Sequence, residues 1–161
     1  MSSIDEISQM IEHLYTMERI ITAIQKRPID YGGVSLHANE AHTLKMIALN
    51  EGISQTELSE QMYRTKGATS VMVDKLVEKG LVHRQRVDGD QRRYLLTLTD
   101  RGRLVHASHI DRDAAHARWA SQHLGLEEAE LKTANEALSQ IIAFYSQSYL
   151  SHGALATQPE Y

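Results

Sequence analysis

Residues 82–99 break the helical pattern that dominates the rest of this chain. The segments VHRQRV and RRYLLTLT flank Asp88-Gly89-Asp90, and an aspartate–glycine pair between two strand-like runs is a strong hairpin signal. Tyr94, Leu96 and Leu98 would share one face of the second strand. A mainly helical chain with one short hairpin can adopt few folds, so this hairpin constrains the fold most strongly.

Elsewhere, apolar residues recur at three- and four-residue spacing, which predicts helices. The expected helices cover residues 4–26, 39–50, 54–62, 65–79, about 100–123 and about 131–149. Asn39 is expected to cap the second helix, Ser54 and Glu57 to form a capping box at the start of the third, and Thr65 to cap the fourth. Residues 30–35 are expected to form a loop.

Charge is unevenly distributed along the 161 residues. The net charge is −4, yet residues 64–93 contain eight basic and four acidic residues. A basic patch on an acidic body is typical of a protein that meets phosphate with one face.

The composition also bears on where the protein works. The chain has no cysteine, which excludes disulfides and thiolate metal sites and fits a cytoplasmic location. No apolar stretch approaches the roughly 20 residues of a membrane span, and the N-terminus lacks the pattern of a signal peptide. We therefore expect no membrane association.

A short capped helix, a turn, a second helix and a basic ribbon, in this order, predict a winged helix-turn-helix. The fold would be mainly α with a small β-hairpin wing. The helix at 65–79 can enter the major groove, and the ribbon can reach phosphate or the minor groove. Candidate DNA contacts are Ser54, Gln55, Thr65, Lys66, Gly67, Ala68, Ser70, Val71, Lys75, Arg86, Arg92 and Arg93. Asp90 is expected to brace the Arg92 guanidinium.

The run TELSEQMYRTKGATSVMVDKLVEKGLVHRQRVDGDQRRYLLTLTDRG resembles the DNA-binding core of the MarR family of bacterial regulators. The pair Asp90 and Arg92, the leucine–threonine strand and Gly102 carry the resemblance, which is strongest over residues 54–103. It implies a transcriptional regulator, commonly a repressor, that binds a pseudo-palindromic operator in double-stranded DNA as a homodimer. It also implies release by a small effector bound between the DNA-binding lobes and the dimer helices.

This resemblance implies a division of the chain into four segments. An N-terminal dimerisation helix and loop would occupy residues 1–36, and the winged helix-turn-helix residues 37–102. C-terminal dimerisation helices would occupy residues 103–150, followed by a flexible tail at 151–161. The apolar seam from Leu131 to Tyr149 agrees with a helix that packs against another helix.

Nine histidines raise the question of a metal. His42, together with His109 and Asp113 one helical turn apart, resembles ligand positions in zinc-sensing members of the family. The match is incomplete, because Ile24 stands where those members place a carboxylate. The segments NEAHTLKMI and LTDRGRLVHASH are instead similar to members that control fatty-acid synthesis genes and respond to acyl chains on a carrier protein. No cofactor is expected to be required, and zinc or an acyl-chain effector stays open.

The sequence also bears on two other functional classes. An enzyme is not expected, because the chain has no GxSxG elbow, phosphate-binding glycine loop or HExxH helix. A helical protein-interaction module is the remaining alternative, because a fold alone does not determine function. The concentration of basic residues at 64–93 argues against that alternative.

Overall fold

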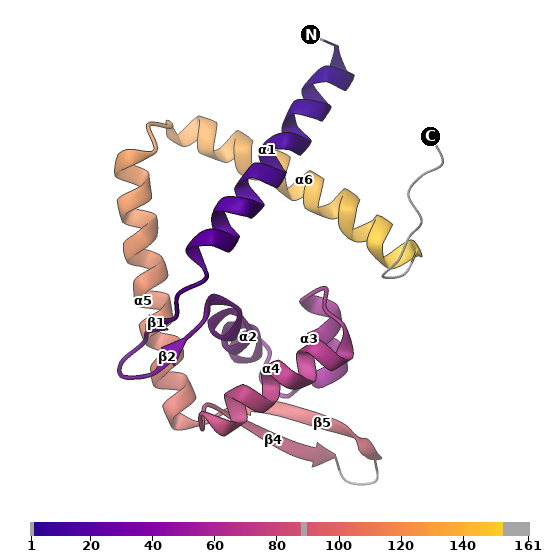
Figure 1. Ribbon diagram of the computed structural model, residues 1–161, viewed down its shortest axis with the longest axis vertical. Helices are drawn as coiled ribbons and strands as arrows, with labels where there is room; N and C mark the ends of the chain where they lie inside the picture. Colours follow the sequence, from indigo (N-terminus) through magenta and orange to yellow (C-terminus); the bar gives the residue numbers. More distant parts are fainter. Residues whose placement is uncertain (1, 88–89, 153–161) are drawn as a thin grey trace. The chain divides into compact units, whose positions relative to one another are not determined.

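The computed structural model describes residues 2–87 and 90–152, including all of their side chains except those of residues 87, 90–93 and 148–152 (Figure 1). The helices are α1 (Ser3–Ile24), α2 (Ala38–Leu49), α3 (Gln55–Gln61), α4 (Lys66–Glu78), α5 (Asp100–His123) and α6 (Glu128–His152). The strands are β1 (Ile29–Asp30), β2 (Ser35–Leu36), β3 (Ile53–Ser54), β4 (Val82–Val87) and β5 (Asp90–Leu98). The chain forms two compact units, residues 1–114 and residues 115–161.

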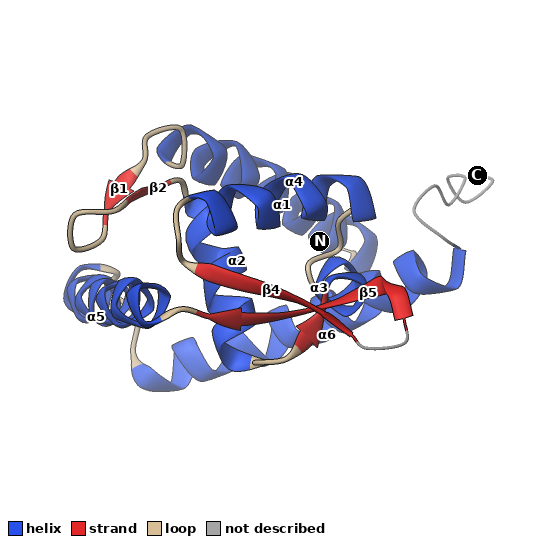
Figure 2. Ribbon diagram, turned by 90° about the horizontal axis from the view of Figure 1, so that it is seen from below, coloured by secondary structure: helices blue, strands red, loops and turns tan. Residues whose placement is uncertain are grey.

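The hairpin predicted at residues 82–99 is present as the antiparallel pair β4–β5 (Figure 2). The mainly helical fold with a small β wing is thereby confirmed. Strand β5 begins at Asp90, whereas residues 88–89 of the predicted turn lie outside the described residues. A third strand, β3, pairs with the other edge of β5, where Ile53 lies opposite Leu96.

Three of the strands, β1, β2 and β3, were not predicted from the sequence. β3 contains only two residues, too few to show an alternating pattern. β1 and β2 pair with each other at the two ends of residues 30–35, the segment that was expected to be a loop. A two-residue strand forms only where another strand can hydrogen-bond to it, and the residues of the short strand do not indicate which strand that is.

The core of the first unit lies where α2, α3 and α4 pack against the three-stranded sheet. Its fully buried side chains include Leu36, Leu44, Ile47, Leu58, Val73, Leu76, Leu81 and Leu96. Each large apolar side chain buried in this way contributes about 1.5–3 kcal/mol. On α4 the buried positions are Thr69, Val73 and Leu76, and this pattern determines which side of the helix faces solvent.

Two predicted helix caps are confirmed. The Ser54 hydroxyl accepts a hydrogen bond from the Glu57 N–H at 3.2 Å, while the Ser54 N–H donates to the Glu57 carboxylate at 2.8 Å. The Thr65 hydroxyl accepts from the Ala68 N–H at 3.1 Å at the start of α4. Both caps satisfy backbone donors that have no partner inside the helix.

The predicted cap of α2 is wrong. The residue that precedes this helix is His37, and Asn39 lies inside its first turn. The Glu40 carboxylate accepts from the His37 N–H at 2.8 Å and so protects the helix start. Asn39 instead accepts a hydrogen bond from Arg64, 2.9 Å away.

Residues 115–161, the second unit, contain the end of α5 and all of α6. Helix α5 runs without interruption across the expected boundary at residues 102/103, and the four-segment division stays a prediction. Gly125, with a φ of +69°, follows α5, as expected of a helix-breaking glycine. Helix α6 includes the first two residues of the expected tail, and residues 153–161 lie outside the described residues. Within the described chain, no helix has the length and apolar character to cross a membrane.

Candidate nucleic-acid interface

Helix α4 has five exposed candidate contact residues, which we define as its outer face: Lys66, Gly67, Ala68, Val71 and Lys75. Thr65, also exposed, caps the helix beside this face, whereas Ser70 is only half-buried. Six of the predicted contact residues are therefore brought together in a strip on one helix. Its positive charge and small side chains suit close approach to nucleic acid.

Helix α3 precedes α4 and supplies two further candidates. Ser54 is 6% exposed, and its hydroxyl is occupied by the capping interaction. Gln55 is half-buried, and its side-chain oxygen is buried without a hydrogen-bond partner among the described residues. The structure gives Ser54 a role in starting α3, and contact of either side chain with DNA stays a prediction.

Two cations of the basic segment at residues 64–93 connect α4 and the turn before it to α2. The Arg64 guanidinium donates to Asn39, and the Lys79 ammonium lies 2.8 Å from the Glu40 carboxylate. Burial by itself would raise the pKa of Glu40, but hydrogen bonds from Lys79 and from the His37 N–H lower it below its usual value. Arg64 and Lys79 therefore connect elements of the fold. The basic surface open to DNA is smaller than the number of basic residues in the sequence indicates.

A third cation connects α4 to the wing. The Arg84 guanidinium, on β4, lies 2.8 Å from the Asp74 carboxylate on α4. It also lies over the ring of Tyr94 on β5, 5.4 Å from the ring centroid. From the sequence, Arg84 is only one charge among eight, because its partners become apparent only when the strand and the helix lie side by side.

The wing carries the remaining basic candidates. Arg86 is exposed on β4. Arg92, Arg93 and Asp90 belong to β5, and their side chains lie outside the described residues. The expected brace between Asp90 and Arg92 therefore stays a prediction.

The predicted zinc residues lie in one region of the first unit. The ring centroids of His42 and His109 are 6.1 Å apart, and His109 is 3% exposed. Asp113 places a carboxylate oxygen 3.7 Å from His109 Nδ1, but the same oxygen lies 3.1 Å from the Lys45 ammonium. Within the described residues, no group of three or more histidine, aspartate or glutamate side chains is arranged to hold a metal ion. A cationic neighbour opposes binding of another cation, so this arrangement does not favour zinc, and the expectation that no metal is required stays a prediction.

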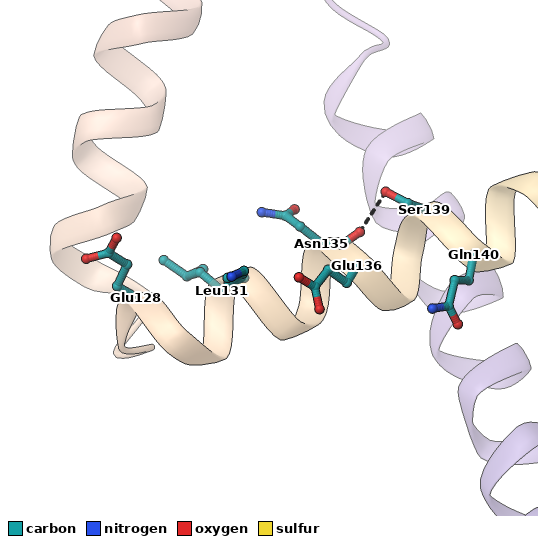
Figure 3. Close-up of a pocket in the computed structure, with 7 residues that line it drawn as sticks. Glu128, Leu131, Asn135, Glu136, Ser139 and Gln140 are labelled. Atoms are coloured by element: carbon teal, nitrogen blue, oxygen red, sulfur yellow. Dashed lines mark hydrogen bonds between the residues drawn. The ribbon is translucent and has the colours of Figure 1, made fainter.

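Each unit also contains a surface hollow. In the first unit, a cleft of about 300 Å³ is lined by Gln25, Ala38, Asn39, His42, Met46 and residues 61–64. In the second unit, seven residues of α6 line an open hollow of about 590 Å³, and there Ser139 donates to the Asn135 carbonyl at 2.8 Å (Figure 3). The α6 hollow is lined mainly by polar side chains of a single helix and is too open to enclose a small molecule. The cleft beside α2 is the better candidate for a ligand site.

Comparisons with known proteins show which family this part of the chain is similar to. Residues 36–94 match the model of the MarR family. The uncharacterised HTH-type transcriptional regulator YhjH of Bacillus subtilis is 30% identical over 87 residues, which are 53% of this chain and 50% of YhjH. The chain thus spans half the length of that relative.

Solved structures agree on the fold. A MarR protein from Peptoclostridium difficile superposes with a TM-score of 0.76 at 22% identity, covering 88% of this chain and 90% of that protein. Streptococcus pneumoniae FabT, solved in complex with DNA, gives a TM-score of 0.67 at 21% identity over 90% of this chain and 99% of FabT. The family match covers α2, α3, α4, β4 and part of β5, the elements that form the candidate interface. Residues 36–94 thus match the MarR family, and the chain has the winged helix-turn-helix fold of the similar solved structures.

Proposed function

We propose that this protein is a cytoplasmic transcriptional regulator, of the repressor type, that binds a pseudo-palindromic operator as a homodimer. The observation that carries the proposal is the exposed strip on α4, with two lysines and small residues, on a MarR-family fold. A helix of this kind fits the major groove of B-form DNA. The FabT structure, solved with DNA, supports this use of the fold.

The proposed homodimer rests on apolar side chains that the single chain leaves in water. Helix α1 has no buried residue. Its exposed large apolar side chains are Ile4, Ile7, Tyr15, Met17, Ile20, Ile21 and Ile24, and those of α6 include Leu138, Ile142, Phe144 and Tyr145. Contiguous apolar surfaces of this kind mark interaction sites in soluble proteins. Sedimentation should therefore show a dimer, and a well-folded monomer at micromolar concentration would contradict the proposal.

The DNA-binding proposal is tested by selecting bound duplexes from a random pool. We expect a two-fold symmetric site whose half-sites lie about 34–36 Å apart, because two-fold symmetry places both α4 helices on one face of the DNA. The affinity for the selected site should exceed that for a scrambled duplex and fall steeply with salt. Recovery of no shared sequence, with equal binding to every duplex, would contradict sequence-specific regulation.

Modulation by a small effector is the second part of the proposal. The cleft beside α2 includes Met46, Met62, Tyr63 and Arg64, so an occupant would contact the turn that leads directly into α4. Its apolar lining residues are compatible with an acyl chain. An acyl group delivered on a carrier protein should raise the melting temperature and weaken operator binding, and Met46→Trp, which fills the cleft, should remove both effects. Unchanged responses in the variant would place the effector elsewhere.

A further inference from the structure

The outer face of α4 contains one feature that charge and size do not explain. Val71 is 57% exposed, although Val73 and Leu76 on the same helix are fully buried. Every residue of α4 is described, and Val71 is the only large apolar side chain of this helix that is mainly exposed to solvent. More than half of the surface of this valine therefore lies in solvent rather than in the packing of the described chain.

The neighbours of Val71 leave room around it. Gly67 has no atom within 4 Å of the position where a Cβ would lie, and Ala68 adds only a methyl group. Lys75, one turn further along, has a long flexible side chain that can turn toward phosphate. Ser70 is half-buried, so Val71 is the more exposed of these two neighbouring residues. A helix that approached DNA with this face would bring the Val71 methyl groups to the groove floor.

The chemistry of the major groove identifies the matching partner. The edges of the bases present hydrogen-bond donors and acceptors, and thymine adds its C5 methyl group. An isopropyl side chain can neither donate nor accept a hydrogen bond, but it gains by covering an apolar group. We propose that Val71 reads a thymine through its C5 methyl group at one position of each half-site. This inference rests on the proposed function and names the base that the outer face of α4 selects.

Deoxyuridine provides the test, because it differs from thymidine only in lacking the C5 methyl group. Each thymine of the selected duplex is replaced singly by deoxyuridine, and the affinity is measured for the wild type, Val71→Ala and Leu49→Ala. We expect one thymine per half-site where the replacement weakens wild-type binding about fourfold, the value of one buried methyl group. The same replacement should not affect Val71→Ala. Leu49→Ala removes a 66% exposed leucine from the end of α2 and should respond as the wild type does.

The outcomes separate this inference from the proposed function. If the full-length dimer binds its selected site but no thymine is sensitive to deoxyuridine, Val71 does not read a methyl group and the inference is overturned. Equal sensitivity in the wild type and Val71→Ala would overturn the inference as well. The affinity lost by removing the thymine methyl group and the affinity lost by truncating Val71 would then be additive, and the two groups would not interact. If no duplex is preferred at all, the proposed function itself fails.

Discussion

Arg84 on β4 forms an ion pair with Asp74 on α4, with an N–O distance of 2.8 Å. The same guanidinium lies over the Tyr94 ring of β5. One cation thus connects both strands of the wing to the helix that carries the candidate DNA-binding face. This bracing restricts how the wing and α4 can move relative to each other.

The Asp74–Arg84 pair should contribute modestly to stability. The two side chains are 44% and 30% exposed, and ion pairs open to solvent contribute about 0.2–1 kcal/mol. Arg84→Ala and Asp74→Ala should each lower the free energy of unfolding by about that amount, measured by urea denaturation. The double variant should lose less than the sum of the two single losses. Strict additivity would show that the pair does not interact in solution.

Gly102→Ala should destabilise the protein by about 1–3 kcal/mol or more. A Cβ at this position would overlap the Leu81 carbonyl oxygen, and backbone cannot easily move aside. The Gly102 N–H also donates to the Thr99 hydroxyl at 2.9 Å at the start of α5, which holds the glycine in place. Gly67→Ala is the matched control, because its Cβ would meet open space, and alanine there should raise helix stability by up to about 1 kcal/mol. Equal melting temperatures of the two variants would contradict the steric argument.

Stability should fall as the pH decreases below about 6.5. Burial lowers the pKa of both His106 and His109 below the ordinary value of 6.5, and the Lys45 ammonium acts in the same direction, while Asp113 opposes it. Between the lowered pKa values and 6.5, the unfolded chain binds more protons than the folded chain, so the free energy of unfolding decreases with falling pH. Above this pH range both histidines are neutral in the folded and the unfolded chain, and their full contribution to the free energy of unfolding is present.

Urea denaturation of the wild type and His109→Gln across this pH range checks the prediction. Glutamine keeps a neutral polar group at the site but does not titrate, so the variant should lose less stability on acidification. Identical pH slopes would show that His109 titrates normally in the folded state.

Arg92→Ala should weaken binding to specific and random duplexes alike and reduce the salt slope by about one unit, because a wing cation that meets phosphate carries little sequence information. Ser70→Ala should instead leave random binding nearly intact and cost about 1–3 kcal/mol at one base position if the hydroxyl contacts a base edge. Titration of both variants at two salt concentrations separates these effects. Unchanged affinities of Arg92→Ala would show that the wing does not contact DNA.

Metal removal should change DNA affinity little. Ile24 offers no ligand atom, and the Lys45 ammonium lies beside the Asp113 carboxylate. Operator titrations with a chelator and with added zinc, repeated on His42→Ala, provide the measurement. A large zinc-dependent shift that His42→Ala abolishes would restore the zinc-sensing hypothesis.

Local chemistry explains what could be predicted from the sequence. The Ser54 and Thr65 caps satisfy backbone donors within three residues, and the hairpin follows from alternation on either side of an aspartate–glycine pair. These interactions join residues that are close together in the sequence, so the sequence alone can predict them. They were sufficient to predict the helices, the wing and the helix that carries the candidate DNA contacts.

By itself, the sequence determined these local elements, their order and the concentration of basic residues near the wing. Tertiary structure decided how those residues are used. Contacts across the fold engage Arg64, Lys79 and Arg84 with partners on other elements, and two-residue β3 forms only because β5 offers it an edge. The burial of Val73 and Leu76 sets the rotation of α4 and thereby exposes Val71 more than Ser70. These ion pairs, the pairing of β3 and the rotation of α4 all depend on contacts between residues that are far apart in the sequence. The spacing of residues within one element does not specify such contacts.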